Sequence, residues 1–326
     1  MQQGLSVTEV RKYKKQLKEL LKIPLVKQKT PEWYELRQNM ITASDFAQAL
    51  GEGKFGTQDQ LIIKKCQTTA DNGGGDNRAN MFFKWGNLFE PVACDLYSLM
   101  HDSIRIHEFG LLQHKQHKFF GASPDGISDI GIMLEIKCPF KRKIIAGGDV
   151  PKQYYYQIQG QLDVCGLEVC DYFECEFEKS NDATDFDDPE SIFTDRYRGV
   201  LIDRRDHSTL YGPIIKPNEE ACAHLKKWVD ESYEGDGEVI YWSLVTWNEQ
   251  RVKKDTAWVN AKLEELSKVW DKILYYRQHP EALQIDVAKN ISIDTELAFP
   301  KKVGGPISQK LDGKLTGYAF RDLADD

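Results

Sequence analysis

The segment GASPDGISDIGIMLEIKCP, residues 121–139, constrains the fold more than any other part of the chain. Its second half is apolar, yet it contains a glutamate and a lysine. Side chains in a strand alternate between two faces, so Glu135 and Lys137 share one face and the aliphatic residues beside them share the other. Because an isolated buried ion pair seldom recovers its desolvation cost, a strand that keeps both charges indicates that they have a function.

A second carboxylate precedes this strand. Asp125 follows a predicted strand at 119–123, and the turn after it returns the chain so that Glu135 lies beside Asp125. Two carboxylates and the carbonyl of Ile136 are sufficient oxygen ligands for a hard cation such as Mg²⁺, which keeps several waters. Lys137, on the same face as Glu135, can orient or deprotonate a metal-bound water and stabilise charge on a phosphate.

Composition limits the class of protein. The 326 residues allow one large domain or two modest ones, and we find neither an apolar run long enough to span a membrane nor a signal peptide. Seven cysteines without a compact framework indicate reduced thiols, so we expect a soluble, intracellular protein. The net charge of −8 does not exclude a nucleic-acid partner, because phosphate is bound by local basic surfaces and not by the net charge. Such clusters occur at 12–29, 115–118 and 141–143.

The periodicity of apolar residues predicts an α/β fold with a central mixed sheet flanked by helices. The predicted helices cover 6–20, a segment from Thr30 to about Asn39, a start near Thr42 or Ser44, 82–100, 152–165 and 258–276. The predicted strands cover 104–113, 119–123, 132–137, 169–177 and 239–245. We expect a helical extension at 1–30, one domain at 31–280 with core motifs at 31–180 and an acidic insertion at about 178–195, and a tail at 281–326.

Several motifs together carry a family resemblance. Asp125, nine intervening residues, then Glu135-Ile-Lys resembles the PD-(D/E)XK nuclease signature. In chain order the sequence contains LRQNMITAS, WGNLFEP, SPDG, LEIKCP and YYYQIQGQL. Over about residues 31–180 this series resembles the lambda-exonuclease family, also called YqaJ-type viral recombinases, in the long form of large DNA viruses. The resemblance implies a restriction-endonuclease-like PD-(D/E)XK core and, if viral, a location in the host cytoplasm or nucleus.

The resemblance also implies a set of metal ligands. Asp125, Glu135 and the carbonyl of Ile136 would bind the catalytic ion, and Glu90 would join Asp125 around a second one. Two Mg²⁺ ions, replaceable by Mn²⁺, would stabilise the entering and leaving oxygens of a displacement at phosphorus. Lys137 would then position the attacking water.

Further residues carry over from the resemblance as nucleophile and substrate contacts. Gln157 would help to hold the attacking water, with Gln159 as the alternative. Arg37 and Ser44 would hold a 5′-phosphate, which agrees with the bidentate grip of a guanidinium and the free N–H groups at a helix start. The implied activity removes one strand of linear duplex DNA from 5′ to 3′ and leaves a 3′ overhang for recombination or replication, with a single-strand annealing protein as a partner.

Other interpretations remain open at this level. The same fold could carry a structure-specific or sequence-specific endonuclease, and a catalytically silent DNA-binding recombination scaffold is a third hypothesis. Glu135 and Lys137 could form a structural ion pair, and Gln157 and Gln159 could be polar positions on an amphipathic helix. An iron–sulfur cluster would need cysteines at a spacing that this chain does not have. The motifs do not specify the oligomeric state.

Overall fold

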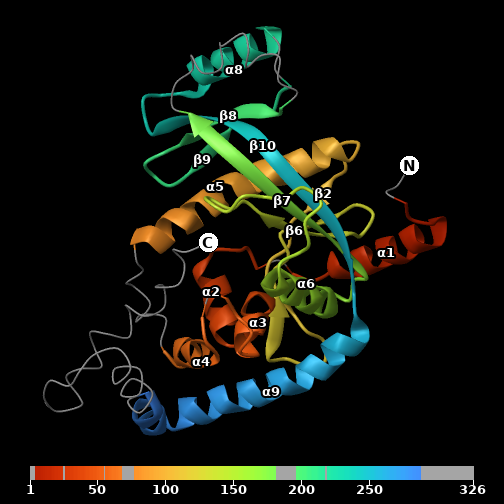
Figure 1. Cartoon of the computed structure of the whole chain (residues 1–326), viewed down its shortest axis with the longest axis vertical. Coiled ribbons are helices and arrows are strands. Elements are labelled where there is room, and N and C mark those ends of the chain that lie inside the picture. Colours follow the sequence, from red (N-terminus) through yellow and green to blue (C-terminus); the bar gives the residue numbers. More distant parts are fainter. Residues whose placement is uncertain are drawn as a thin grey trace, which may run out of the picture.

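The computed structural model describes residues 4–24, 26–54, 56–67, 77–180, 196–216 and 219–287 (Figure 1). Its helices are α1 (Val7–Leu20), α2 (Pro31–Gln38), the 3₁₀ turn η1 (Ala43–Asp45), α3 (Phe46–Ala49), α4 (Gln58–Cys66), α5 (Asn77–Met100), α6 (Lys152–Cys165), α8 (Glu219–Ser232) and α9 (Thr256–Gln278). Its strands are β1 (Ile41–Thr42), β2 (Ile106–His107), β3 (Leu112–Gln113), β4 (Phe120–Ala122), β5 (Gly126–Ser128), β6 (Met133–Lys137), β7 (Val169–Ser180), β8 (Arg198–Asp203), β9 (Thr209–Tyr211) and β10 (Glu238–Lys253). No described helix is both long and apolar enough to cross a membrane.

The strands form two sheets. The main sheet has the order β2-β5-β6-β7-β10-β8-β9, and a small sheet has the order β1-β4-β3. In the main sheet β5 and β6 form an antiparallel hairpin, whereas β6 and β7 run parallel and are joined through α6. A helix, a hairpin, a crossover helix and a parallel strand therefore follow one another, and the predicted mixed α/β core flanked by helices is confirmed.

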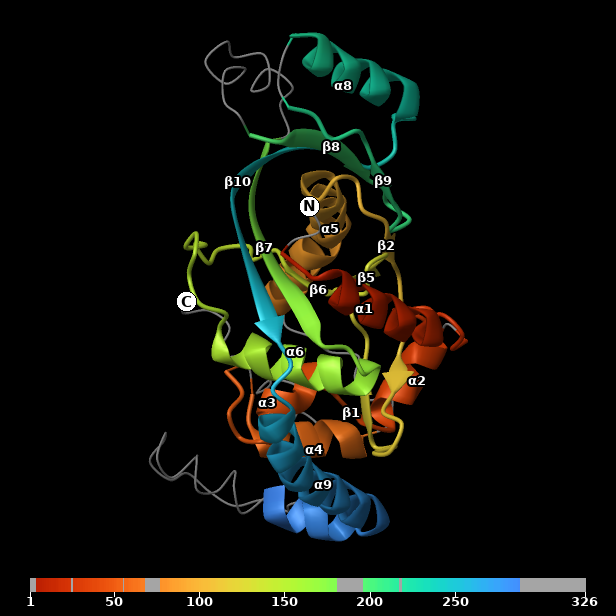
Figure 2. The ribbon, with the colours of Figure 1, turned by 90° about the vertical axis from the view of Figure 1, so that its right-hand side faces the viewer.

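The two faces of β6 pack into different hydrophobic clusters, as the alternation predicts. Met133 belongs to the cluster that includes α6 residues, and Leu134 and Ile136 belong to the cluster built on α5. Figure 2 shows α6 crossing the lower ends of β7 and β10, with α5 behind these strands. The charged residues of β6 therefore lie on the face that α6 covers.

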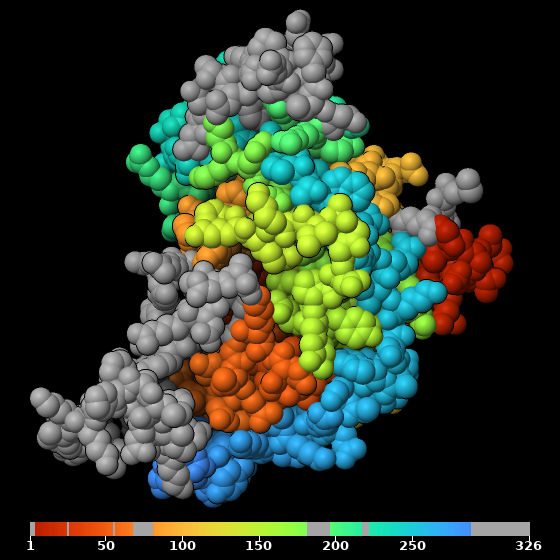
Figure 3. Space-filling model, in the orientation of Figure 1, coloured from red at the N-terminus to blue at the C-terminus, as the bar shows by residue number. Residues whose placement is uncertain are grey.

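Three helix predictions are confirmed by their local contacts. Ser6 caps α1 with its side chain and forms the expected capping box with Glu9, and Thr30 caps α2 ahead of Pro31. The apolar stripe of α9 packs into the main core through Val259, Leu263, Leu266 and Ile273. In the space-filling view, α3 and α4 lie between α6 and α9 (Figure 3).

One strand prediction was wrong. Residues 104–113 form two short strands in different sheets, β2 and β3, because the chain leaves the main sheet after His107. A Cβ atom at Gly110 would lie 1.8 Å from the carbonyl oxygen of Val26, so the two backbones are packed directly against each other. This contact between distant segments has no signal in strand periodicity.

Other elements were missed or shortened. The sequence patterns did not predict β5, α4, or the unit of β8, β9 and α8, which has its own small core around Val200 and Leu225. Strands β7 and β10 are longer than predicted, since they pair with each other along 169–180 and continue into that unit (Figure 1). Residues 181–195 of the acidic insertion and 288–326 of the tail lie outside the described residues.

Candidate active site

Asp125 and Glu135 lie side by side, as expected from the connection between their strands. Gly126, the first residue of β5, pairs with Leu134 in the β5–β6 register, so Asp125, directly before β5, lies next to Glu135. The N–H of Ile136 donates to Oδ2 of Asp125 at 2.7 Å. Glu135 is completely buried, and this burial places a carboxylate where charge is costly unless it is paired.

Lys137 contacts two of the three groups that were predicted to bind the catalytic ion. Its Nζ donates to Oε1 of Glu135 and, at 3.1 Å, to the carbonyl oxygen of Ile136. The ammonium also lies 5.1 Å from the ring centroid of Tyr154. A cation is therefore already accommodated between the carboxylate and the carbonyl, and the donor set of this site fits a hard divalent ion.

The carboxylate cluster contains more carboxyl groups than cations. Burial raises the pKa of Asp125 well above its ordinary value, and the nearby charges of Glu135 and Glu90 raise it further, whereas Lys137 opposes the rise. Burial alone would lower the pKa of Lys137, but the carboxylates of Glu135 and Asp125 raise it. One lysine does not neutralise this cluster, which is typical of a functional site rather than a structural ion pair.

Glu90 lies on α5 and acts on this cluster through its electric field. Its charge raises the pKa of Asp125 and of Cys138, in each case after the larger effect of burial. Within the described parts of the chain, however, no group of three His, Cys, Asp or Glu side chains is close enough to hold a metal ion. Its role as a ligand of a second ion stays a prediction.

Arg37 and Ser44 line the same cavity, which has a volume of about 180 Å³. Nη2 of Arg37 donates to Oγ of Ser44 at 3.0 Å, and the guanidinium lies 4.4 Å from the ring centroid of Trp33. Burial lowers the pKa of Arg37. The lining residues are Gln28, Trp33, Arg37, Thr42, Ala43, Ser44, Ser123, Gln157 and Gln161.

The three glutamines of α6 have different surroundings. Gln157 lines the cavity. Gln159 instead joins α6 to the segment before α9, since its Nε2 donates to the carbonyl of Lys253 at 2.8 Å and its Oε1 accepts from the N–H of Asp255 at 2.7 Å. This structural use of both amide atoms argues against the alternative role for Gln159.

Gln161 was not singled out in the sequence. It lines the cavity, and its Nε2 donates to Oε2 of Glu135 at 2.8 Å. Residues four apart share a helix face, so the spacing from Gln157 could have identified it. Gln161 joins the Arg37 cavity to the carboxylate cluster, and this contact makes the two predicted subsites parts of one site.

Part of this chain is similar to a known protein family. Residues 32–168 match the YqaJ-like viral recombinase domain. This chain contains a YqaJ-like viral recombinase domain. The domain covers every predicted site residue, from Arg37 to Gln157, and the resemblance inferred from the motifs is confirmed.

The YqaJ-like domain has relatives in a large DNA virus and among solved structures. The chain is 30% identical to an uncharacterized protein of Acanthamoeba polyphaga mimivirus over 80% of this chain and 55% of that protein, so it spans about half of that relative's length. It is similar to the alkaline exonuclease LHK-Exo of Laribacter hongkongensis, with 17% identity and a TM-score of 0.48 over 79% of this chain and 100% of that one. A phage related exonuclease from Haemophilus somnus matches with 13% identity and a TM-score of 0.39 over 75% of this chain and 96% of that one.

Proposed function

We propose that this protein is a Mg²⁺-dependent exonuclease that removes nucleotides from the 5′-phosphorylated ends of linear duplex DNA and leaves 3′ overhangs for recombination. The observation that carries the proposal is the contact of Gln161, which lines the Arg37 cavity, with the carboxylate of Glu135. A cavity whose lining suits an anion and a carboxylate cluster that suits a cation are thereby adjacent. The family membership of residues 32–168 and the exonuclease names of similar structures are consistent with it.

The proposed site has one group of residues that binds the terminal phosphate and another that binds the metal and the attacking water. Arg37 and Ser44 would bind the terminal phosphate through the guanidinium and the hydroxyl, and Trp33 supports the guanidinium from below. Asp125, Glu135 and the carbonyl of Ile136 would hold Mg²⁺, which when bound supplies Lewis-acid stabilisation of the phosphate and an acidified water. Lys137 is placed to orient or deprotonate the attacking water beside Glu135.

A time course on linear duplex DNA tests the proposal. Substrates with 5′-phosphate and 5′-hydroxyl ends are compared with a covalently closed circle, in Mg²⁺, in Mn²⁺ and in EDTA. We expect selective loss of the phosphorylated strand, no cutting of the circle, and no activity in EDTA. Glu135→Ala should abolish cleavage, whereas Glu178→Gln, an exposed β7 variant with the same loss of charge, should not.

Two outcomes would replace the proposal. Cutting of the closed circle would establish an endonuclease, because an exonuclease needs an end. DNA binding without cleavage in either metal would establish the scaffold hypothesis, in which the carboxylates serve no hydrolysis. Equal rates on both kinds of 5′ end would leave a nuclease but remove the phosphate role of Arg37 and Ser44.

A further inference from the structure

The cavity side of Arg37 is fixed by a chain of hydroxyl contacts. The guanidinium donates to Oγ of Ser44, whose oxygen lies 3.0 Å from Oγ1 of Thr42. Oγ1 of Thr42 in turn donates to Oδ2 of Asp45 at 2.8 Å. Because the hydroxyl hydrogen of Thr42 is directed to Asp45, that of Ser44 is directed to Thr42, and the orientation of the whole chain depends on a carboxylate outside the cavity.

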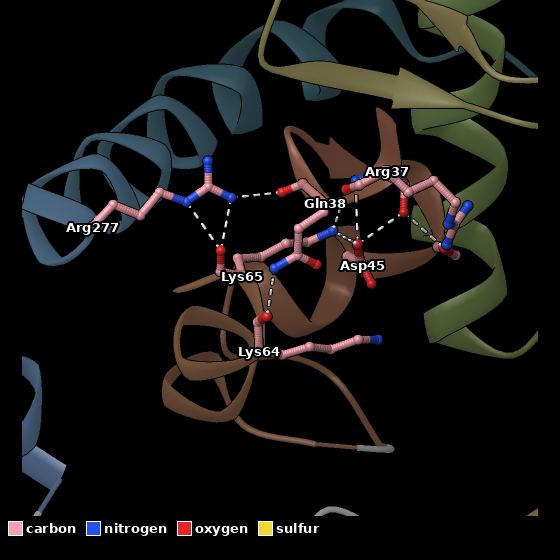
Figure 4. Close-up of polar contacts among 8 residues, drawn as sticks. Arg37, Gln38, Asp45, Lys64, Lys65 and Arg277 are labelled. Atoms are coloured by element: carbon pink, nitrogen blue, oxygen red, sulfur yellow. Dashed lines mark hydrogen bonds and ion pairs between the residues drawn. The ribbon is translucent and has the colours of Figure 1, made fainter. Parts of the chain in front are cut away.

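Lys65 closes this chain into a ring. It is 4% exposed on α4, its Nζ lies 3.1 Å from Oδ2 of Asp45, and the same ammonium donates to the main-chain carbonyl of Arg37 at 2.8 Å. Figure 4 shows Asp45 between Lys65 and Arg37. Arg37 is therefore held at both ends, at its guanidinium through Ser44 and at its main chain through Lys65.

Arg277 holds the helices that carry this ring. It reaches from α9, outside the matched residues 32–168, and its Nη2 donates to the carbonyls of Gln38 and Lys65, each at 2.7 Å (Figure 4). Its Nε makes a second bond to the Lys65 carbonyl at 3.0 Å. The guanidinium carbon lies 5.3 Å from the centroid of the Trp270 ring.

The position of these carbonyls explains the need for a cation. Gln38 is the last residue of α2, and Lys65 is in the last turn of α4. Carbonyls at a helix C-terminus lack intrahelical partners and carry a partial negative charge, so two such ends repel when they meet. One guanidinium satisfies both ends, and the side chain of Gln38 adds bonds to the carbonyls of Lys64 and Gln67 at 2.8 and 2.9 Å.

We propose that Arg277 is a positioning residue for recognition of the 5′-phosphate. It joins the C-terminal ends of α2 and α4, which keeps Lys65 on the main chain of Arg37 and aims the Arg37 guanidinium into the cavity. This inference rests on the proposed function, in which Arg37 and Ser44 bind the terminal phosphate. Helix α9 then contributes to the selection of 5′-phosphorylated ends, although it lies outside the YqaJ-like domain.

Steady-state kinetics of the full chain on 5′-phosphate and 5′-hydroxyl duplexes test this role. In Arg277→Gln we expect the KM for phosphorylated ends to rise roughly tenfold, because charge-assisted hydrogen bonds are lost, while kcat and the rate on hydroxyl ends hold. Arg277→Lys keeps the charge but loses the several fixed donors of the guanidinium, so it should show a smaller rise in KM. Lys268→Met, which removes an exposed cation from the same helix, is the matched control and should behave as wild type.

The outcomes separate this inference from the function on which it rests. An unchanged preference in folded Arg277→Gln, or an equal loss on both kinds of end, would overturn the positioning role while wild type still prefers phosphate. If Arg277→Gln does not fold, Arg277→Lys must still show the selective rise in KM, and its absence would be equally decisive. Wild-type protein that lacks any preference for phosphorylated ends would refute the proposed phosphate pocket and this inference together.

Discussion

Two buried aspartates of this molecule have opposite electrostatic surroundings. Asp45 is 7% exposed, pairs with Lys65, and accepts hydrogen bonds from the N–H and hydroxyl of Thr42. Burial alone would raise the pKa of Asp45, but Lys65 and further cations hold it below its ordinary value. Asp125 instead adjoins the buried Glu135, and its pKa is raised well above its ordinary value by burial and then by that charge.

The difference separates a charge that the chain itself pairs from a charge at the proposed metal site. The charge of Asp45 is compensated by the chain itself, so ionisation of this group favours the folded state. The charge of Asp125 is compensated only in part, by Lys137 and the N–H of Ile136, so ionisation costs folding free energy that an external cation would offset. Local conflict of this kind concentrates at functional sites, where the ligand rather than the fold satisfies the charge.

The largest expected effect follows from removing the carboxylate of Asp125. Asp125→Asn should lower kcat by about 10³-fold or more, because a carboxylate predicted to bind the metal is lost. It should not lower the midpoint of thermal unfolding at neutral pH, since the amide oxygen can still accept from the N–H of Ile136 and the repulsion from Glu135 is relieved. Loss of stability together with activity would show that Asp125 is structural.

Removing Lys65, the cation that pairs with Asp45, should lower the stability of the fold. Lys65→Met leaves Asp45 buried without its partner, which should cost about 3 to 5 kcal/mol of unfolding free energy in urea titrations. Lys64→Met, the exposed neighbour, should change it by less than about 0.5 kcal/mol. Asp45→Asn combined with Lys65→Met should cost less than the sum of the single changes. Additive costs would mean that the pair is not coupled.

A smaller effect is expected at Gln161, which lies between the Arg37 cavity and the carboxylate cluster. Gln161→Met removes a hydrogen bond to the Glu135 carboxylate and should reduce kcat/KM about tenfold. Gln157→Met, one turn away on the same face, keeps that bond and serves as the comparison. A larger loss in Gln157→Met, measured on the same linear duplex, would favour Gln157 as the glutamine that holds the attacking water, as predicted from the sequence.

These two regions also differ in how far sequence could predict them. The carboxylate cluster is local, since Asp125, Glu135 and Lys137 lie on one hairpin whose alternation fixes their faces. The ring behind Arg37 joins α2, η1 and α4, and Arg277 acts on it from 239 residues beyond Gln38. A buried lysine and a helix-end arginine have no periodic signal of their own. The fold class, set by alternation and caps, was therefore predictable, whereas the contacts that aim Arg37 needed the tertiary structure.

The smallest expected effect is the pH dependence of stability, and its sign differs between the two aspartates. The pKa of Asp45 is lowered in the folded state, so its contribution is present above its ordinary value near 3.8 and is lost as the pH falls through the folded pKa. The pKa of Asp125 is raised, so its contribution is present below that ordinary value and is lost as the pH rises through the folded pKa.

Thermal unfolding in EDTA from about pH 2 to pH 8 measures both signs against the matched amide variants. The advantage of wild type over Asp45→Asn should shrink as the pH is lowered, because the protonated carboxyl no longer attracts Lys65. The unfolding midpoint of wild type should fall furthest below that of Asp125→Asn at the highest pH, where the carboxylate of Asp125 is ionised. Added Mg²⁺ should remove only the second difference, because only that aspartate depends on an external cation. Parallel curves for both variants would show that the two aspartates do not differ in the way their surroundings indicate.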